Sequence, residues 1–211
     1  MSNMPEIPVV EEHLQNVDRY YRFHSQIYDA TRWSFLFGRT ALIQQIPSLP
    51  ANPHILEVGC GTGRNLIHLK QRFHDAQITG VDVSADMLDK ARNKITDSSV
   101  RLKKLRYGSG NLNKTSFDLI LLSYSLTMMG AKHPQIMTRL KNDLAPDGYL
   151  AVVDFHTSPF SWFRKWMSIN HVDFSGNLYP RLKANFQSRQ HSFHSAYLGL
   201  WNYFLFTGKL N

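Results

Sequence analysis

The chain has 211 residues, 43% of them hydrophobic, with one cysteine and a formal net charge of +8. This length suits a single α/β domain with a full core, and no apolar run approaches the roughly 20 residues that span a bilayer. Glutamates near the N-terminus argue against a secretion signal, and the lone Cys60 excludes an internal disulfide and a cysteine-rich metal site. We therefore expect a cytoplasmic protein without a bound metal.

The segment before residue 50 is rich in aromatic residues and arginine. Residues 9–19 and 24–38 have patterns that predict one or two helices. We expect residues 1–50 to form an N-terminal helical lid that belongs to the same domain as residues 51–211.

Strands and helices then alternate along the chain. A strand at 54–59 leads through a glycine-rich turn into a helix at 64–72, and a second strand at 77–83 is followed by Ser84 as the N-cap of the next helix. Further strands are predicted at 100–105, 117–123 and 149–155, with a helix at 134–144 before the last of them. This alternation indicates a mostly parallel sheet that is covered by helices on both faces.

The pattern changes after residue 154. Residues 158–169, "SPFSWFRKWMSI", are amphipathic, and β-rich runs at 191–198 and 201–209 flank Gly199. A tight reversal there predicts an antiparallel hairpin at the edge of the sheet. The fold class is thus α/β with three layers and a mostly parallel seven-stranded sheet that ends in a C-terminal antiparallel hairpin.

The stretch "ILEVGCGTGRN" at 55–65 combines glycines with an acid at the end of a strand. Three glycines let the backbone turn sharply and approach a ligand, but the glycine that completes a dinucleotide fingerprint is replaced by Arg64, and Glu57 would repel a pyrophosphate. Asp82 ends the second strand, where a carboxylate can accept hydrogen bonds from ribose hydroxyls. A ligand with a ribose, a positive charge and no phosphate fits, which describes S-adenosyl-L-methionine.

This arrangement resembles the class I S-adenosylmethionine-dependent methyltransferases, which have a Rossmann-like fold. Their Glu-x-Gly-x-Gly-x-Gly motif is matched by Glu57, Gly59, Gly61 and Gly63. The resemblance implies a wider cofactor site, in which Val83 and Met87 pack on adenine or simply belong to the core. A nucleotide-binding or non-catalytic Rossmann-like domain is the alternative. The further cofactor-binding candidates are Tyr28, Arg32, Cys60, Asn65, Ser109, Gly110 and Ser123.

The segment after the fourth strand bears on the methyl acceptor. It reads "SYSLTMM" instead of the Asp/Asn-Pro-Pro-Tyr/Phe loop of nucleic-acid amino methyltransferases, so we expect no nucleic-acid partner. With "YYRFHSQIYDATRWSFLFGR", "WFRKWMSINHV" and "YLGLWNYFLFTGKL", it resembles the methyltransferases that convert diacylglyceryl-homoserine to its trimethylated betaine lipid. The resemblance implies N-methylation of a lipid amine. The alternatives are a soluble small-molecule acceptor, a cofactor-binding domain without catalysis and, from charge alone, a nucleic-acid substrate.

Tyr124 and His156 are the candidate catalytic residues. Tyr124 follows the fourth strand at the edge where ligands bind in open α/β sheets, and its ring could hold a methylated amine by cation–π contact. His156 follows the fifth strand and could accept a proton, although a structural histidine or a water base is also compatible. In the lid, Tyr28 could cover the sulfonium and Arg32 could pair with the methionine carboxylate, or both could pair within the protein.

The amphipathic stretch at 158–169 has two interpretations. Its aromatic and basic residues suit a helix on an anionic bilayer, at the inner face of the membrane, and they also suit a helix packed on the sheet. Positive charge by itself would serve nucleic acid, anionic lipid or solubility equally well.

Overall fold

The structure is a computed structural model that describes residues 36–109, 112, 116–129, 133–169 and 172–210. Phe37–Asn211 form one compact unit, and Met1–Leu36 form a second unit of which only Leu36 is described. The predicted lid therefore falls mostly outside the described residues and stays a prediction.

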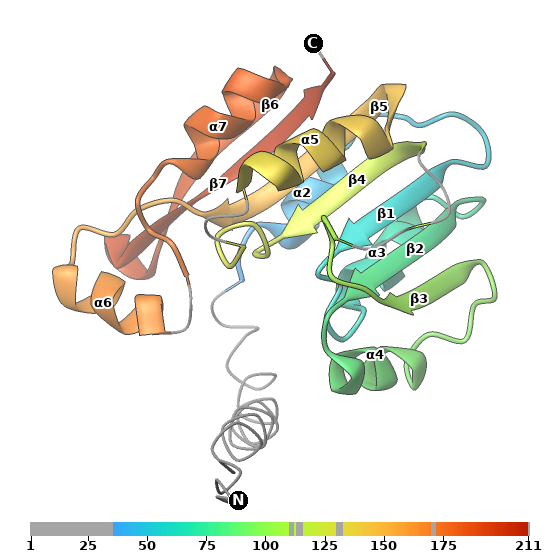
Figure 1. Cartoon of the computed structure of the whole chain (residues 1–211), viewed down its shortest axis with the longest axis horizontal. Coiled ribbons are helices and arrows are strands. Elements are labelled where there is room, and N and C mark those ends of the chain that lie inside the picture. The colour runs from blue at the N-terminus through green and yellow to red at the C-terminus, as the bar shows by residue number, and fades with distance from the viewer. Residues whose placement is uncertain (1–35, 110–111, 113–115, 130–132, 170–171, 211) are drawn as a thin grey trace, which may run out of the picture. The chain divides into compact units, whose positions relative to one another are not determined.

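A seven-stranded sheet forms the centre of the larger unit (Figure 1). The strand order is β3-β2-β1-β4-β5-β7-β6, and β7 runs antiparallel to both of its neighbours. This topology confirms the predicted parallel sheet with a C-terminal antiparallel hairpin. The strands are β1 (His54–Val58), β2 (Gln77–Asp82), β3 (Val100–Lys104), β4 (Phe117–Ser123), β5 (Leu144–Phe155), β6 (Gln187–Ala196) and β7 (Trp201–Lys209).

Helices cover both faces of the sheet (Figure 1). One face carries a large apolar core in which side chains of β1, β4, β5 and β7 meet α5 and α7. On the other face α2 and α3 pack together, and α4 lies against β2 and β3. The described helices are α2 (Arg39–Gln45), α3 (Arg64–Arg72), α4 (Ala85–Arg92), α5 (His133–Asp143), α6 (Ser161–Ile169) and α7 (Leu178–Asn185).

The structure departs from the sequence prediction at several elements. Helix α2 begins at Arg39, where the predicted helix at 24–38 ends, and β6 runs from 187 to 196 instead of 191 to 198, because Gln187 already pairs with Lys209 and residues 197–199 form a 3-10 turn. Strand β5 begins at Leu144, before the predicted start at 149, because Leu144 pairs with Phe117 ahead of a register shift in β4. Helix α7 was not predicted. It is short, but Leu178 and Leu182 are buried four residues apart, and Pro180 lies in the first turn, where a proline is tolerated.

Within the described part of the chain, no helix is both long enough and apolar enough to cross a membrane.

Candidate functional site

The glycine loop follows β1 and wraps around the end of β2. The backbone N–H groups of Gly59 and Cys60 both donate to the carbonyl of Val81, at 2.8 and 3.0 Å. Gly59 and Gly63 have φ angles of 75° and 79°, and a Cβ on Gly59 would lie 2.8 Å from the Cβ of Ser125. Both positions therefore require glycine. Gly63 is the N-cap of α3, so the loop ends where a helix N-terminus begins.

Asp82, the last residue of β2, shapes this loop. Its Oδ2 accepts a hydrogen bond from the N–H of Gly61 at 2.8 Å, and its Oδ1 accepts one from the N–H of Ser84 at 2.9 Å. Each carboxylate oxygen has two acceptor positions, so Asp82 can hold the loop and still accept the two hydroxyls of a ribose.

Glu57 lies on β1 beneath the loop and is only 1% exposed. Its Oε1 accepts a hydrogen bond from the side-chain amide of Asn65 at 2.8 Å, whereas Oε2 has no hydrogen-bond partner among the described residues. Burial raises the pKa of Glu57 from 4.5 to about 8, against the hydrogen bond from Asn65 and the charge of Arg39, and the charge of Asp82 raises it further. A buried carboxylate with an unused oxygen fits a ligand that brings positive charge.

Close packing of α3 produces this burial. Gly80 on β2 is the neighbour of Glu57 across the strand pair, and a Cβ there would lie 2.7 Å from Leu66 of α3 and 3.0 Å from the sulfur of Cys60. The same burial raises the pKa of the Cys60 thiol, so Cys60 lines the loop as a neutral, unreactive side chain.

The two residues predicted to contact adenine differ in exposure. Val83 follows β2 and is 56% exposed, so its side chain is available to a flat ligand. Met87 lies inside α4 and is nearly buried, and its N–H donates to the predicted N-cap Ser84 at 3.3 Å. Val83 thus fits a contact with the base, while Met87 mainly anchors α4.

The remaining predicted cofactor residues lie on separate segments. Ser123 ends β4 and is buried, whereas Ser109 is exposed in a turn where its N–H and hydroxyl both donate to the carbonyl of Arg106. Tyr28, Arg32 and Gly110 lie outside the described residues, so their roles stay predictions.

Tyr124, a predicted catalytic residue, is 2% exposed and adopts a left-handed backbone with φ of 54°. Its hydroxyl donates to the carbonyl of Phe37 at 2.9 Å, and burial raises the pKa of Tyr124 well above 10. The ring packs edge-on against Phe155 with centroids 4.6 Å apart. In this structure Tyr124 ties the strand end to the segment before α2, and its catalytic role stays a prediction.

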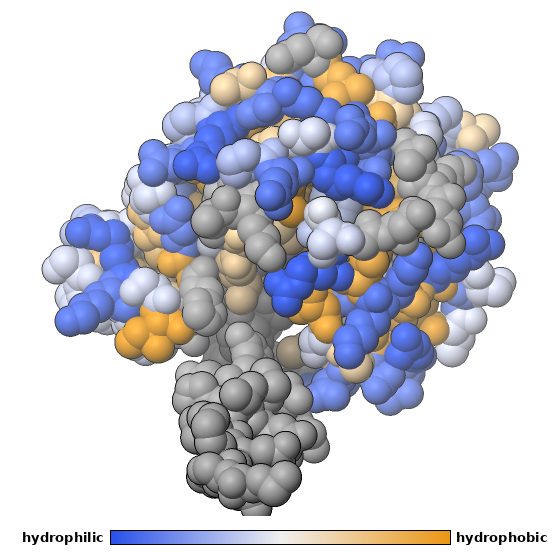
Figure 2. Space-filling view, in the orientation of Figure 1, coloured by the Kyte–Doolittle hydropathy of each residue, from blue (hydrophilic) through white to orange (hydrophobic). Residues whose placement is uncertain are grey.

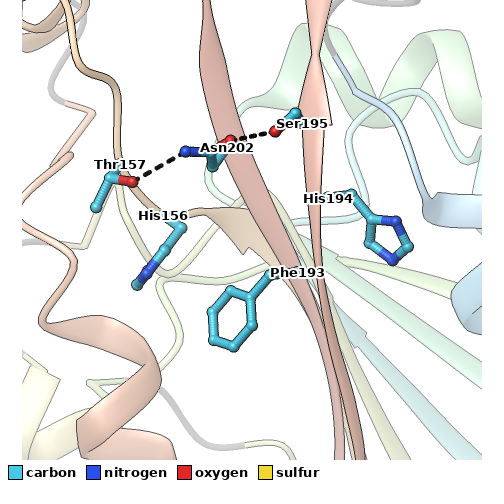
Figure 3. A pocket seen from close by; sticks show the side chains of 6 residues that line it. All are labelled: His156, Thr157, Phe193, His194, Ser195 and Asn202. Carbon is cyan, nitrogen blue, oxygen red and sulfur yellow. Dashed lines mark hydrogen bonds between the residues drawn. The ribbon is translucent and has the colours of Figure 1, made fainter. Parts of the chain in front are cut away.

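His156, the other predicted catalytic residue, lines a cavity of about 420 Å³ beside β6 and β7 (Figure 3). Burial lowers the pKa of His156, and its Nδ1 has no hydrogen-bond partner in the described part of the chain. Sequence reasoning missed the polar neighbours. In Figure 3, Ser195 donates to Asn202 and Asn202 donates to Thr157, at 2.6 and 3.3 Å. Because Asn202 lies 45 residues from Thr157 and these residues belong to no motif, only the strand pairing could reveal them.

Asp154 lies one residue before the end of β5 and is fully buried. Its Oδ2 accepts from the N–H groups of Leu126 and Thr127, and its Oδ1 accepts from the Thr127 hydroxyl and the Phe155 N–H. Burial raises the pKa of Asp154 from 3.8 to about 6, and these hydrogen bonds oppose the rise. Asp154 therefore fixes the loop after β4. In the described residues, no group of three metal-binding side chains occurs.

The fold and the glycine loop match those of class I S-adenosylmethionine-dependent methyltransferase domains. Residues 55–148 match the methyltransferase domain family, which covers the loop, Asp82 and β4. The matched part of the chain is therefore similar to domains of that class, and S-adenosylmethionine is the cofactor that its site fits.

Similar proteins agree with this class. The chain is 32% identical over 142 residues to trans-aconitate 2-methyltransferase of Deinococcus radiodurans, covering 65% of this chain and 48% of that protein. It is 30% identical over 152 residues to malonyl-[acyl-carrier protein] O-methyltransferase of Priestia megaterium, covering 69% and 53%. The chain thus spans about half the length of these relatives.

A solved structure shows the same fold. Geranyl diphosphate C-methyltransferase from Streptomyces coelicolor, in complex with S-adenosyl-L-homocysteine, superposes with a TM-score of 0.70 at 12% identity, covering 82% of this chain and 79% of that one. These relatives support the class and leave the predicted betaine-lipid substrate a prediction.

Proposed function

We propose that this chain transfers the methyl group of S-adenosylmethionine to a small-molecule acceptor that carries its own nucleophile. The observation behind this proposal is that three reactive side chains near the carboxyl edge, those of Asp154, Tyr124 and Cys60, already have partners or are unreactive. Asp154 accepts four hydrogen bonds, the Tyr124 hydroxyl donates to Phe37, and the Cys60 thiol is held neutral. A carboxylate or a free amine needs neither a covalent nucleophile nor a strong base.

The residues of the site have distinct roles in this proposal. The bound cofactor supplies a methyl group on a positively charged sulfur. Asp82 accepts hydrogen bonds from the ribose hydroxyls of the cofactor, and the glycine loop approaches its amino-acid end. Glu57 offers its unused oxygen to the ammonium group of the cofactor. Catalysis then consists mainly of alignment and exclusion of water, and alignment contributes roughly 7 to 11 kcal/mol in well-oriented reactions.

A carboxylate is the first acceptor to consider. The two relatives described above are named for trans-aconitate and a malonyl thioester, both of which carry carboxylates. The net charge of +8 attracts such anions over long range. These similarities favour a soluble acceptor over the lipid amine that the sequence resemblance implied.

The lipid amine of diacylglyceryl-homoserine is the second candidate. It is supported by aromatic side chains at the surface of α6, which follows β5 at the carboxyl edge of the sheet. For an amine, His156 is the proton acceptor to consider, because its lowered pKa keeps the ring neutral near pH 7.

Transfer of a labelled methyl group tests this proposal. The purified chain is incubated with labelled S-adenosylmethionine and one of three acceptors: trans-aconitate and other soluble carboxylates, soluble amines, or vesicles that contain the homoserine lipid. Label in a soluble acceptor, lost in Asp82→Ala and kept in the nearby exposed control Asp86→Ala, supports the main proposal. Label in the lipid alone selects the second candidate. Cofactor binding without label in any acceptor overturns both.

A further inference from the structure

We propose that the exposed side of α6, together with the turn between β6 and β7, is a docking surface for an anionic lipid bilayer. This inference concerns where the protein binds and does not depend on which acceptor it methylates.

Helix α6 has two apolar faces. Phe163 and Met167 are buried, and Phe163 stacks on Trp201 with centroids 5.5 Å apart and an angle of 8° between the rings. A second stripe remains at the surface, in which Trp162 is 62%, Trp166 48% and Ile169 67% exposed. Their i, i+4, i+7 spacing places these three on one side of the helix. Packing on the sheet therefore accounts for one apolar face and leaves the other in solvent.

The neighbouring turn adds two more exposed apolar side chains. Tyr197 is 53% exposed and Leu198 is fully exposed, and their φ angles of 46° and 54° are left-handed. Non-glycine residues rarely adopt this conformation, and strain of this kind clusters at functional positions. The tight hairpin turn, which needs left-handed residues, thus holds Leu198 outward into solvent.

The turn and α6 lie next to each other. The Ser158 hydroxyl, just before α6, donates to the carbonyl of Leu200 at 2.7 Å, and Tyr197 packs on Trp201 with centroids 4.9 Å apart. Figure 1 places α6 beside the end of the β6–β7 hairpin, and Figure 2 shows apolar surface at α6 next to hydrophilic side chains. The two elements therefore form one surface.

The charge of the residues around this surface indicates what binds to it. Residues 155–211 contain a single acid, Asp173, and six lysines and arginines, of which Arg164 and Lys165 lie on α6. The carboxylate of Asp173 already accepts from the N–H and the hydroxyl of Ser175. Lys165, exposed on α6, lies beside the Trp162 stripe. Tryptophan and tyrosine favour the bilayer interface, and cations favour anionic headgroups, so this composition fits an anionic bilayer better than an apolar protein groove.

The test uses the full chain and vesicles of phosphatidylglycerol with phosphatidylcholine, compared with vesicles of phosphatidylcholine alone. The chain is expected to float with the anionic vesicles and not with the neutral ones. The double variant Trp162→Ala with Ile169→Ala is expected to bind the anionic vesicles more weakly by roughly tenfold or more, while Trp162→Phe with Ile169→Leu keeps most of the binding.

Two charge-reversal variants complete the experiment. Lys165→Glu is expected to weaken vesicle binding by roughly tenfold, and the same change on α5, Lys141→Glu, is expected to have a much smaller effect. Circular dichroism and binding of S-adenosylhomocysteine verify that each variant is folded, and neither measurement requires turnover.

Three outcomes would overturn the inference. The first is that the unmodified chain does not bind anionic vesicles, and the second is that the double alanine variant binds them equally well. The third is a dimer in sedimentation that the alanine variant abolishes, because this surface would then be covered by a second copy of the chain. A failed methyl-transfer assay would leave vesicle binding unaffected.

Discussion

The ends of β1 and β5 each carry a buried carboxylate one residue before the strand ends, yet the two acids are satisfied in different ways. Asp154 on β5 accepts four hydrogen bonds from the protein, so both of its oxygens are fully used. Glu57 on β1 accepts one hydrogen bond, and its Oε2 has no partner in the described chain. Burial alone therefore does not separate a structural acid from a ligand-binding one, whereas the number of donors around it does.

The largest expected effect comes from neutralising each acid with its own amide. In Asp154→Asn, either orientation of the amide places its NH₂ group against at least one backbone N–H group. This is expected to lower the free energy of unfolding by about 3 kcal/mol or more, since each unsatisfied buried group costs about 1 to 3 kcal/mol. Glu57→Gln keeps its bond from Asn65 and is expected to be no less stable at pH 8. Urea unfolding measures both, and equal losses would contradict the comparison.

The pH dependence of stability should separate the same two acids. Both pKa values are higher in the folded state, so each acid contributes stability at low pH that is lost as the pH rises. For Glu57 the loss falls between pH 4.5 and about 8, and for Asp154 between pH 3.8 and about 6. Each pKa unit corresponds to about 1.4 kcal/mol. In urea titrations without ligand, Glu57→Gln is expected to remove the decrease above pH 6, and a decrease that persists would show that another group causes it.

Cofactor binding should depend on Glu57 and on its proton. Because a cationic ligand favours the ionised carboxylate, binding of S-adenosylhomocysteine is expected to release protons and to strengthen as the pH rises from 7 toward 8.5. Glu57→Gln is expected to weaken binding by roughly 10- to 100-fold, the range for a hydrogen bond to a charged group. Calorimetry in two buffers with different ionisation enthalpies measures both effects. An unchanged affinity of the variant for S-adenosylhomocysteine would show that Glu57 does not contact the ligand.

The smallest effect is expected at the adenine contact. Val83→Ala should weaken binding of S-adenosylhomocysteine by less than about tenfold with little change in stability, because its side chain is exposed without ligand. Met87→Ala, at a buried position, should instead lower stability by about 2 kcal/mol or more. Thermal unfolding with and without ligand distinguishes the two. A stability loss in Val83→Ala would assign that residue to the core.

The cofactor half of the domain could be predicted from the sequence because its requirements are local. Gly59 and Gly63 need left-handed backbone, Asp82 ends a strand, and Ser84 caps a helix. The surroundings of Tyr124 and His156 could not be predicted in the same way. The Tyr124 hydroxyl is used by Phe37, 87 residues earlier, and His156 meets Asn202 only through the pairing of β5 with β7. Helical spacing predicted that α6 is amphipathic, but only the packing on Trp201 shows which side is covered.

Gly80 on β2 affects the environment of Glu57 on the adjacent strand β1. A Cβ there would lie 2.7 Å from Cδ1 of Leu66 on α3 and 3.0 Å from the Cys60 sulfur, so these side chains would have to shift and the packing beside Glu57 would loosen. Water would then enter beside Glu57, the effective dielectric constant around the carboxylate would rise, and its pKa would return toward 4.5. The absence of a side chain at Gly80 thus helps to keep the pKa of Glu57 high, although Gly80 itself takes no part in the chemistry.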